Sequence, residues 1–384
     1  MPPRQKDEQS KPFDWVGEAV RSIVLVGGEG TRLRPLTLST PKQLLPIAGM
    51  SMLERVLAPL AAAGISEVGL SLGYHPEAFL KRFPESQAAG MSLRYAVEPE
   101  PLGTGGGIRF AAVNCGMESE TFLVHNGDVL TGADFSALVA FHRSTGAKAT
   151  LALVEVEDPS AFGVVVTDPE GRVNAFVEKP RREDAPSKLV SAGTYVLEPE
   201  VLDLIPEGRA VSVEREVFPV LAAQGSLYGL PQRSYWLDAG TPEKYVRANL
   251  DYLGAKPPVP GAREVAPAVW SLDGTPPHGT ARGNCLLLEG AVLRPGSVVE
   301  NAIVGEGAIV GEGAVVRRSV LLGGCLVGNG ACVEDSVIGP GARVGSNALV
   351  KGWSIVGDEA RIPERGHCRG ERVAGGEMRE IQAK

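Results

Sequence analysis

The apolar positions between residues 22 and 252 form short runs that are separated by glycine, proline or polar residues. Helix-forming patterns lie between these runs. Strands that alternate with helices predict an α/β domain whose mostly parallel sheet is covered on both faces. In such a sheet, ligands bind beyond the carboxyl ends of the strands. The runs that predict buried strands are residues 22–28, 67–72, 121–124 and 149–156.

A different pattern occupies residues 283–360, where an aliphatic residue returns every five or six positions. Turn pairs such as Glu306-Gly307 and Asn329-Gly330 separate the units. Glycine suits these corners because it adopts left-handed backbone angles freely. About thirteen units predict a β-solenoid of about four coils, each with three short faces around an aliphatic core. An antiparallel β-domain also uses glycine turns, but the regular spacing favours the solenoid.

The two patterns divide the chain into five parts. We expect a flexible tail over residues 1–20 and a C-terminal tail over residues 373–384. The α/β domain covers residues 21–252 and the solenoid covers residues 283–372. Residues 253–282 are rich in proline and are expected to form a linker or a wrapped connection between them.

Charge and composition exclude several classes of function. The 384 residues carry 38 basic and 46 acidic side chains, a net charge of −8, which argues against a nucleic-acid-binding surface. No apolar run approaches the roughly 20 residues of a membrane-spanning helix, and residues 1–20 lack the apolar segment of a signal peptide. The five cysteines contain no CxxC pair, so we expect reduced thiols and no zinc site. These features predict a cytoplasmic protein that binds neither nucleic acid nor membrane.

The strongest local motif follows the first predicted strand. Residues 27–35 read GGEGTRLRP, and residues 41–46 read PKQLLP. Backbone N–H groups in a glycine-rich turn bind phosphate, and Arg32 and Lys42 add positive charge. The spacing matches neither a Walker loop nor a dinucleotide-binding GxGxxG turn.

This motif resembles the signature of the nucleoside-diphosphate-sugar pyrophosphorylases, or sugar-1-phosphate nucleotidylyltransferases, GGxGTRLxPLT followed by PKxLxP. Further family motifs follow in order as PLGT, NGD, FG, VEKP, SAGTY, SVEREVFP and YWLDAGTP. The segments PLGTGGGI, HNGDVL and SVEREVFP are most similar to the actinobacterial-type mannose-1-phosphate guanylyltransferases. The resemblance implies a Rossmann-like nucleotidyltransferase domain and a left-handed parallel β-helix of hexapeptide repeats.

The same resemblance implies a reaction and a set of roles. In the implied reaction a sugar-1-phosphate attacks the α-phosphate of a nucleoside triphosphate and pyrophosphate is released. The resemblance favours mannose-1-phosphate as the sugar phosphate and GTP as the nucleotide. Such phosphoryl chemistry depends on positioning and charge neutralisation. Mg²⁺ would be held by Asp128 and Asp238, since oxygen ligands suit this ion. The implied catalytic residues are Arg32, Lys42, Asp128 and Lys179.

The resemblance also implies two sets of binding residues. Glu178 would accept hydrogen bonds from sugar hydroxyls, and Lys179 would bind the sugar phosphate. The nucleotide set is Gly27, Gly28, Gly30, Thr31, Arg32, Lys42, Glu98, Gly103, Thr104, Asn126 and Asp128. The sugar-phosphate set is Gly163, Glu178, Lys179, Ser191, Ala192 and Asp238.

The sequence leaves open which nucleobase and which sugar the protein recognises. A carboxylate at Glu98 or Glu100 could accept the N–H donors of guanine, which adenine lacks. Ser191 stands where the family usually has asparagine, and its hydroxyl is shorter. Glucose-1-phosphate or a cyclitol phosphate such as valienol-1-phosphate, with GTP, ATP or dTTP, therefore remains an alternative.

Residues near the motifs have simpler interpretations as well. We expect Tyr235 and Trp236 to pack in the core. The five histidines have no ligand spacing and are expected to be structural or exposed, although His125 adjoins the metal turn.

Two other functions fit the sequence less well. Hexapeptide acyltransferases usually work with a histidine in the solenoid, and residues 283–360 contain none. A regulatory homologue would lose the charged site residues, whereas Arg32, Lys42, Asp128 and Asp238 are all present. The solenoid is expected to support a homodimer or homotetramer.

Overall fold

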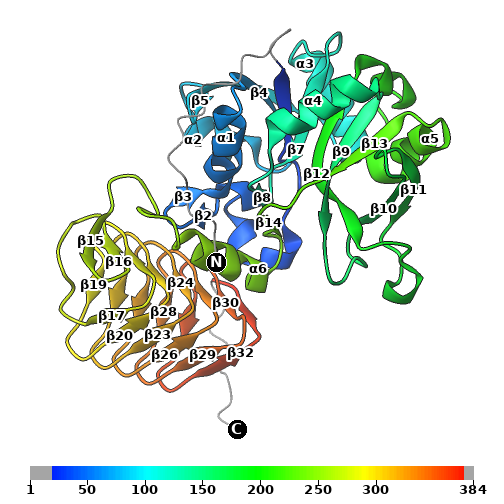
Figure 1. Cartoon of the computed structure of the whole chain (residues 1–384). Coiled ribbons are helices and arrows are strands. Elements are labelled where there is room, and N and C mark those ends of the chain that lie inside the picture. The colour runs from blue at the N-terminus through cyan, green and yellow to red at the C-terminus, as the bar shows by residue number, and fades with distance from the viewer. Residues whose placement is uncertain (1–19, 376–384) are drawn as a thin grey trace. The chain divides into compact units, whose positions relative to one another are not determined.

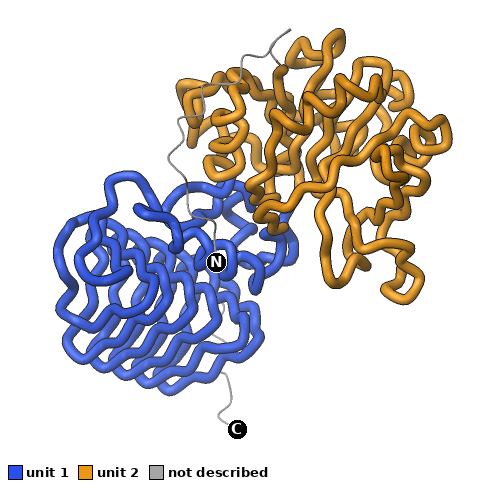
Figure 2. Tube along the Cα trace, viewed as in Figure 1, with its two compact units in different colours: residues 1–4, 29–52, 239–384 blue, residues 5–28, 53–238 orange. Residues whose placement is uncertain are grey.

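The computed structural model of the chain describes residues 20–375, and they form two compact units (Figure 2). The sheet unit contains residues 20–28 and 53–238. The solenoid unit contains residues 29–52 and 239–375. The boundaries predicted at residues 252 and 282 follow chain order, whereas these units follow packing. The segment that carries the GGEGTRLRP motif is therefore split after Gly28, and its larger part packs with the C-terminal repeat.

Four parallel strands form the centre of the sheet unit, in the order β6-β4-β1-β7 (Figure 1). Antiparallel pairing attaches β12 to β7 and β9 to β12, and β13 runs parallel to β9. A hairpin of β10 and β11 extends one edge, and β5 closes the other. The mostly parallel α/β sheet is confirmed, as are the four predicted strands. The bounds are β1 Arg21–Leu25, β4 Glu67–Leu72, β5 Gln87–Ala88, β6 Met91–Val97, β7 Phe122–Asn126, β9 Ala149–Glu155, β10 Gly163–Thr167, β11 Val173–Glu178, β12 Leu189–Leu197 and β13 Leu227–Pro231.

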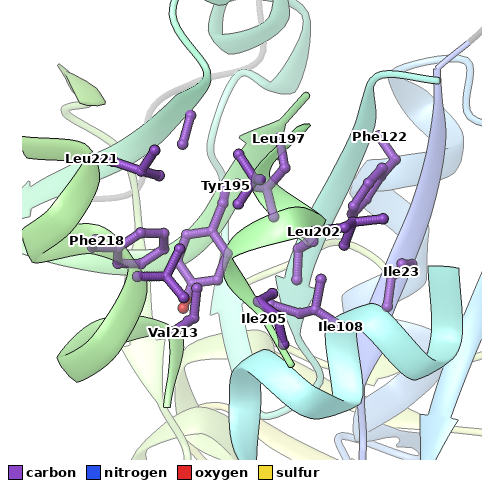
Figure 3. Packing of buried hydrophobic residues seen from close by; sticks show 14 of the residues in the cluster. Ile23, Ile108, Phe122, Tyr195, Leu197, Leu202, Ile205, Val213, Phe218 and Leu221 are labelled. Carbon is purple, nitrogen blue, oxygen red and sulfur yellow. The ribbon is translucent and has the colours of Figure 1, made fainter. Parts of the chain in front are cut away.

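Helices pack against this sheet and bury its apolar side chains. Tyr195 and Phe218 are almost fully buried and meet edge to face, with ring centroids 5.1 Å apart (Figure 3). Ile108 of α3 and Phe122 of β7 belong to the same cluster. The helices are α1 Met52–Ala62, α2 Pro76–Arg82, α3 Gly103–Asn114, α4 Phe135–Thr145 and α5 Phe218–Ala223, with short 3₁₀ turns η4 Arg182–Asp184 and η5 Pro199–Leu204 and a π-helical turn η6 Val213–Val217.

The strand order reverses at β1, because β4 follows on one side and β7 lies on the other. Ligands of open α/β sheets bind at such a reversal, beyond the carboxyl ends of the strands. Two predicted site segments begin there, at Gly27 after β1 and at Asn126 at the end of β7. The topology therefore brings these two motifs to one edge of the sheet.

Three sheets of short strands, parallel except for one antiparallel strand at the start of the first sheet, build most of the solenoid unit (Figure 1). Residues 17 or 18 positions apart pair from coil to coil, as in Leu287, Val304 and Leu321, whose side chains are buried in the core. The predicted solenoid is confirmed, and three strands that join its sheets lie inside the expected linker at residues 253–282. The strands are β15 Arg263–Ala266, β16 Val269–Ser271, β18 Cys285–Leu287, β21 Ile303–Val304, β24 Val320–Leu321, β27 Val337–Ile338, β30 Ile355–Val356 and β33 Arg372–Val373 in the first sheet, β17 Thr280–Arg282, β20 Val298–Glu300, β23 Val315–Arg317, β26 Cys332–Glu334, β29 Leu349–Lys351 and β32 His367–Arg369 in the second, and β19 Val292–Leu293, β22 Ile309–Val310, β25 Leu326–Val327, β28 Arg343–Val344 and β31 Arg361–Ile362 in the third.

The motif segment 29–52 packs against this β-helix within the solenoid unit. Pro35 lies so close to Gly357 that a methyl group there would stand 2.5 Å from Pro35 Cγ. The hydroxyl of Ser39 donates a hydrogen bond to the carboxylate of Asp358. The segment contains the 3₁₀ turns η1 Thr31–Leu33, η2 Leu36–Leu38 and η3 Lys42–Leu44 and the strands β2 Pro46–Ile47 and β3 Met50–Ser51.

Helix α6, Pro242–Tyr252, holds the end of the same segment. The Tyr245 hydroxyl donates to the carbonyl oxygen of Pro46 at 2.6 Å, and the amide of Ala48 donates to Asn249 Oδ1 at 2.9 Å. Thr241 caps the start of this helix, because its hydroxyl accepts from the amide of Lys244. Within residues 20–375, no helix is long and apolar enough to cross a lipid bilayer.

Candidate active site

One pocket of the sheet unit collects most of the polar residues predicted to bind the sugar phosphate and the metal. All six residues of the predicted sugar-phosphate set line it, and so do Asn126 and Asp128. These residues come from five separate stretches of chain, which only the folded sheet brings together. The complete lining is Asn126, Asp128, Val129, Ala161, Phe162, Gly163, Glu178, Lys179, Ser191, Ala192, Gly193, Tyr195, Glu214, Trp236 and Asp238.

The two predicted metal carboxylates lie at one end of a small two-stranded ribbon. Strand β8, Val129–Thr131, pairs with β14, Trp236–Asp238, in antiparallel fashion. Asp238 is the register partner of Val129, which directly follows Asp128. Both side chains line the same pocket, so the β8–β14 pairing brings the two carboxylates to one pocket.

The turn that carries Asp128 is held by the buried ring of His125. Its Nε2–H donates to the carbonyl oxygen of Val129 at 3.0 Å, and its Nδ1 accepts from the Thr194 hydroxyl at 2.7 Å. Gly127 lets the turn lie against β1, since a methyl group there would stand 2.5 Å from Val26 Cγ1. His125 therefore has a structural role: its side chain spans the Asn126–Asp128 turn and binds Val129 on the far side of it.

Burial also predicts how His125 affects stability. Its removal from water lowers the pKa of His125 to about 4, from an ordinary value near 6.5. Between these two pKa values the unfolded chain binds a proton at His125 that the folded chain does not. The contribution of His125 to the free energy of unfolding is therefore complete above pH 6.5 and is lost as the pH falls to 4. We expect His125→Gln to reduce the slope of unfolding free energy against pH in this window by up to about 1.4 kcal/mol per pH unit.

Urea denaturation at several pH values between 4 and 7 measures that slope. His278→Gln is the matched control, because His278 is exposed. A slope in His125→Gln equal to that of the unmodified chain would contradict the assignment.

Strands β10 and β11 place the predicted sugar and phosphate ligands. Gly163 is the register partner of Glu178, and any side chain at Gly163 would overlap the ring of Phe176. Glu178 is mostly buried, whereas Lys179 is exposed and its Nζ lies 3.1 Å from Glu178 Oε1. Lys179 has a φ of 49°, in the left-handed region that costs a non-glycine residue energy. Such a conformation is retained where the surrounding structure requires it, which is common at binding sites.

A bulge in β12 shapes the opposite wall. The register with β9 shifts between Ser191 and Tyr195, and Gly193 within the bulge has a φ of +71°. The amide of Gly193 donates to Ser191 Oγ at 3.4 Å, and a side chain at Gly193 would stand 2.7 Å from Asn126 Nδ2. Burial, together with the nearby carboxylates of Glu214 and Glu178, raises the pKa of Tyr195. This wall therefore presents Ser191 and a neutral phenol.

The carboxylate of Glu98, the predicted base-binding residue, accepts hydrogen bonds from other residues of the chain. Its Oε1 accepts from the Ser71 hydroxyl at 2.6 Å, and its Oε2 accepts from the amide of Leu102 at 3.1 Å. Gly107 allows this approach, since a methyl group there would stand 2.9 Å from Glu98 Oε1. These contacts fix the loop before α3. Recognition of guanine by Glu98 or the exposed Glu100 stays a prediction.

The glycines of the PLGTGG loop have a packing role. Gly103 has a φ of +69°, and a side chain there would meet the carbonyl oxygen of Val211 at 2.6 Å. A side chain at Gly106 would likewise meet the carbonyl oxygen of Arg209, at 2.8 Å. These glycines let residues 209–211 lie against the start of α3, and this contact accounts for glycine at both positions without a ligand.

The basic residues of the nucleotide set lie in the solenoid unit. Arg32 lies in η1 and is exposed, and Lys42 begins η3 and is largely buried. Gly30, with a φ of +63°, would bring any side chain to 3.0 Å from Lys42 Cβ and from Thr37 Cγ2. The tight turn at Gly30 therefore fixes Lys42 beside the motif. Their binding of the triphosphate stays a prediction, as does that of Gly27, Gly28 and Thr31.

The chemistry of the pocket fits a divalent cation. Its lining has four carboxylates, at Asp128, Glu178, Glu214 and Asp238, and one ammonium, at Lys179. A doubly charged sugar phosphate would be repelled there without a further cation. Asn126 Oδ1 is buried and has no hydrogen-bond partner among the described residues. Within residues 20–375 no group of three or more His, Cys, Asp or Glu side chains is arranged to hold a metal ion.

The pocket also contains residues that the sequence analysis did not assign. Trp236 lines it, meets Phe162 edge to face at 5.1 Å, and donates from Nε1 to the carbonyl oxygen of Ala192 at 3.0 Å. Tyr235 is 39% exposed, so the expectation that both aromatic residues pack in the core is wrong. Tyr235 directly precedes β14, and in extended chain neighbouring side chains point to opposite faces, so Tyr235 and Trp236 point to different sides. Glu214 is the other unassigned polar residue, and only its place in the SVEREVFP motif could have drawn attention to it.

Comparison with known proteins identifies the family of this fold. The Nucleotidyl transferase family profile matches residues 21–254, and the profile of the GMPPB C-terminal domain matches residues 281–382. The chain belongs to the nucleotidyl transferase family. The resemblance stated from the sequence motifs is thereby confirmed.

Individual relatives place this nucleotidyl transferase more closely. The mannose-1-phosphate guanylyltransferase of Mycobacterium tuberculosis is 48% identical over 282 residues, which cover 73% of this chain and 73% of that protein. The mannose-1-phosphate guanyltransferase of Eremothecium gossypii is 38% identical over 62% of this chain and 65% of that protein, just under two thirds of its length. The crystal structure of HddC from Yersinia pseudotuberculosis complexed with GMP-PN is 28% identical with a TM-score of 0.53, covering 61% of this chain and 99% of that one.

Proposed function

We propose that this nucleotidyl transferase forms GDP-mannose and pyrophosphate from GTP and mannose-1-phosphate, with Mg²⁺ as its metal. The observation that carries the proposal is the single pocket that collects Asp128, Glu178, Lys179 and Asp238 with the other predicted sugar-phosphate residues. The names of its relatives support the choice of GTP and mannose-1-phosphate.

The reaction joins one phosphate oxygen of the sugar phosphate to the α-phosphorus of GTP. The bond between the α-phosphorus and the bridging oxygen breaks, and pyrophosphate leaves with the electron pair. In the proposal Lys179 binds the sugar phosphate, Glu178 accepts from a sugar hydroxyl, and Arg32 and Lys42 bind the triphosphate. Asp128 and Asp238 would hold Mg²⁺, which when bound neutralises phosphate charge during the transfer.

A grid of pyrophosphate-release assays tests the function. Its rows are GTP, ATP and dTTP, and its columns are mannose-1-phosphate, glucose-1-phosphate and a cyclitol phosphate, all with Mg²⁺. We expect the highest kcat/KM for GTP with mannose-1-phosphate. Release only with ATP or dTTP would overturn the guanylyl assignment, and no release in any cell would overturn the catalytic one. Repeating the GTP and ATP rows with Glu98→Gln and Glu100→Gln shows whether either carboxylate selects guanine.

Two further predictions concern the setting of the reaction. The cytoplasmic location and the homodimer or homotetramer formed through the β-helix stay predictions. An outward apolar column on the third sheet of the solenoid, formed by Val292, Ile309 and Leu326, supports the second.

A further inference from the structure

Glu214 connects two parts of the sheet unit that the sequence analysis assigned to different substrates. It lies in η6, is partly buried, and lines the sugar-phosphate pocket. The same carboxylate accepts a hydrogen bond from Thr104, which belongs to the predicted nucleotide loop at the start of α3. One side chain therefore touches both the pocket wall and the nucleotide loop.

The two oxygens of Glu214 have different surroundings. Oε2 accepts from Thr104 Oγ1 at 2.6 Å and from Ser212 Oγ at 2.8 Å. Thr104 Oγ1 in turn accepts from the amide of Val213 at 3.0 Å. No hydrogen bond within residues 20–375 reaches Oε1. A carboxylate with one oxygen engaged keeps its other oxygen available to accept a further hydrogen bond.

The backbone reinforces the link between Thr104 and Glu214. The amide of Val211 donates to the carbonyl oxygen of Leu102 at 2.9 Å, and the amide of Gly105 donates to the carbonyl oxygen of Val211 at 2.8 Å. The close approach at Gly103 leaves no room between the two segments. A displacement of the nucleotide loop must therefore move the segment that carries Glu214, because close-packed elements shift together.

We propose that Glu214 binds a sugar hydroxyl through Oε1, and that the nucleotide loop sets the position of this carboxylate through Thr104. The inference rests on the proposed function, since it assigns Glu214 to the sugar-phosphate substrate of that reaction. Glu178 and Glu214 then accept from different hydroxyls of one sugar, so together they read the configuration of the ring.

Glu214→Gln tests the sugar contact. Glutamine has the same shape, and its carbonyl oxygen can accept from Thr104 and Ser212, which leaves an NH₂ group in place of Oε1. We expect the KM for mannose-1-phosphate to rise about ten- to a hundredfold, as for loss of a charged hydrogen bond, with little change in the KM for GTP. Glu216→Gln, an exposed change in the same turn, is the matched control and should leave both KM values unchanged.

Deoxy analogues of mannose-1-phosphate identify the contact itself. The unmodified enzyme should bind one of the monodeoxy analogues markedly more weakly than mannose-1-phosphate. In Glu214→Gln that penalty should disappear, because the partner of the missing hydroxyl is already gone. A merely structural role for Glu214 would leave the penalty in place.

Variants of Thr104 test the link while leaving Glu214 unaltered. Calorimetry measures the Kd of mannose-1-phosphate with and without a GTP analogue that has a methylene bridge between the α- and β-phosphates. We expect the analogue to tighten sugar-phosphate binding at least fivefold in the unmodified enzyme, a typical coupling between two sites. Thr104→Ser should keep this effect and Thr104→Val should lose it, because only serine retains the hydroxyl.

The outcomes separate this inference from the proposed function. An unmodified enzyme that releases no pyrophosphate in the assay grid overturns both. An active enzyme in which Glu214→Gln keeps the native KM for mannose-1-phosphate and the native response to deoxy analogues overturns the sugar contact alone. Equal coupling in Thr104→Val and the unmodified enzyme overturns the link through Thr104.

Discussion

Replacing Asp238 by asparagine should lower kcat/KM for GDP-mannose formation by about a thousandfold, because a metal ion contributes several kcal/mol of charge stabilisation to such a transfer. Asp238 ends β14 and lines the same pocket as Asp128, a pocket with four carboxylates and one lysine. Asparagine keeps the size of the side chain and removes its charge, so the affinity for Mg²⁺ should fall. The fold should persist, since Asp238 is not part of the apolar core.

Steady-state pyrophosphate release at increasing Mg²⁺ concentrations measures this effect. The variant should need much more Mg²⁺ and should recover part of its activity at high concentration. Asp203→Asn, an exposed aspartate in η5, is the matched control. Turnover within a few-fold of the unmodified enzyme at low Mg²⁺ would remove Asp238 from the metal site.

Replacing Lys179 by methionine should raise the KM for mannose-1-phosphate by about ten- to a hundredfold, the usual cost of losing a charged hydrogen bond. Lys179 is the single basic residue of the pocket lining, and it occupies the left-handed region at φ 49° directly after Glu178. Methionine keeps the length of the side chain and carries the same backbone cost. The loss should therefore report the ammonium group.

The KM for GTP should change far less than that for the sugar phosphate, and the melting temperature should stay nearly constant. The exposed Lys188 provides the control Lys188→Met. Equal increases in both KM values, or none, would show that Lys179 does not contact the sugar phosphate.

The motifs predicted most of the polar residues that line the pocket because short-range chemistry constrains them. Asp128 follows an Asn-Gly turn at the end of β7, and Glu178 ends β11 directly before Lys179, so each local pattern also marks a strand end. Gly163 was assigned to the sugar through its motif, and the structure adds that it faces the ring of Phe176. The need for glycine at this position depends on the register between β10 and β11, which the local sequence does not encode.

Local sequence patterns do not predict the positions of Trp236 and Glu214. Trp236 was expected in the core but lines the pocket, because the β8–β14 pairing decides which face each side chain of β14 occupies. Glu214 received no role, although its carboxylate reaches both Thr104 and the pocket. Thr104 and Glu214 are 110 positions apart in the chain, and no periodic pattern in the sequence connects them.

The sequence by itself determined the alternation of strands and helices, the repeat of the β-helix and most of the charged residues that line the pocket. These features follow from steric and hydrogen-bonding preferences that act over a few residues. Only the tertiary structure decided that segment 29–52 packs on the β-helix through Pro35 and Gly357, and that the glycines of the PLGTGG loop face residues 209–211. Contacts of this kind depend on how distant surfaces fit together, and that fit is a property of the whole folded chain.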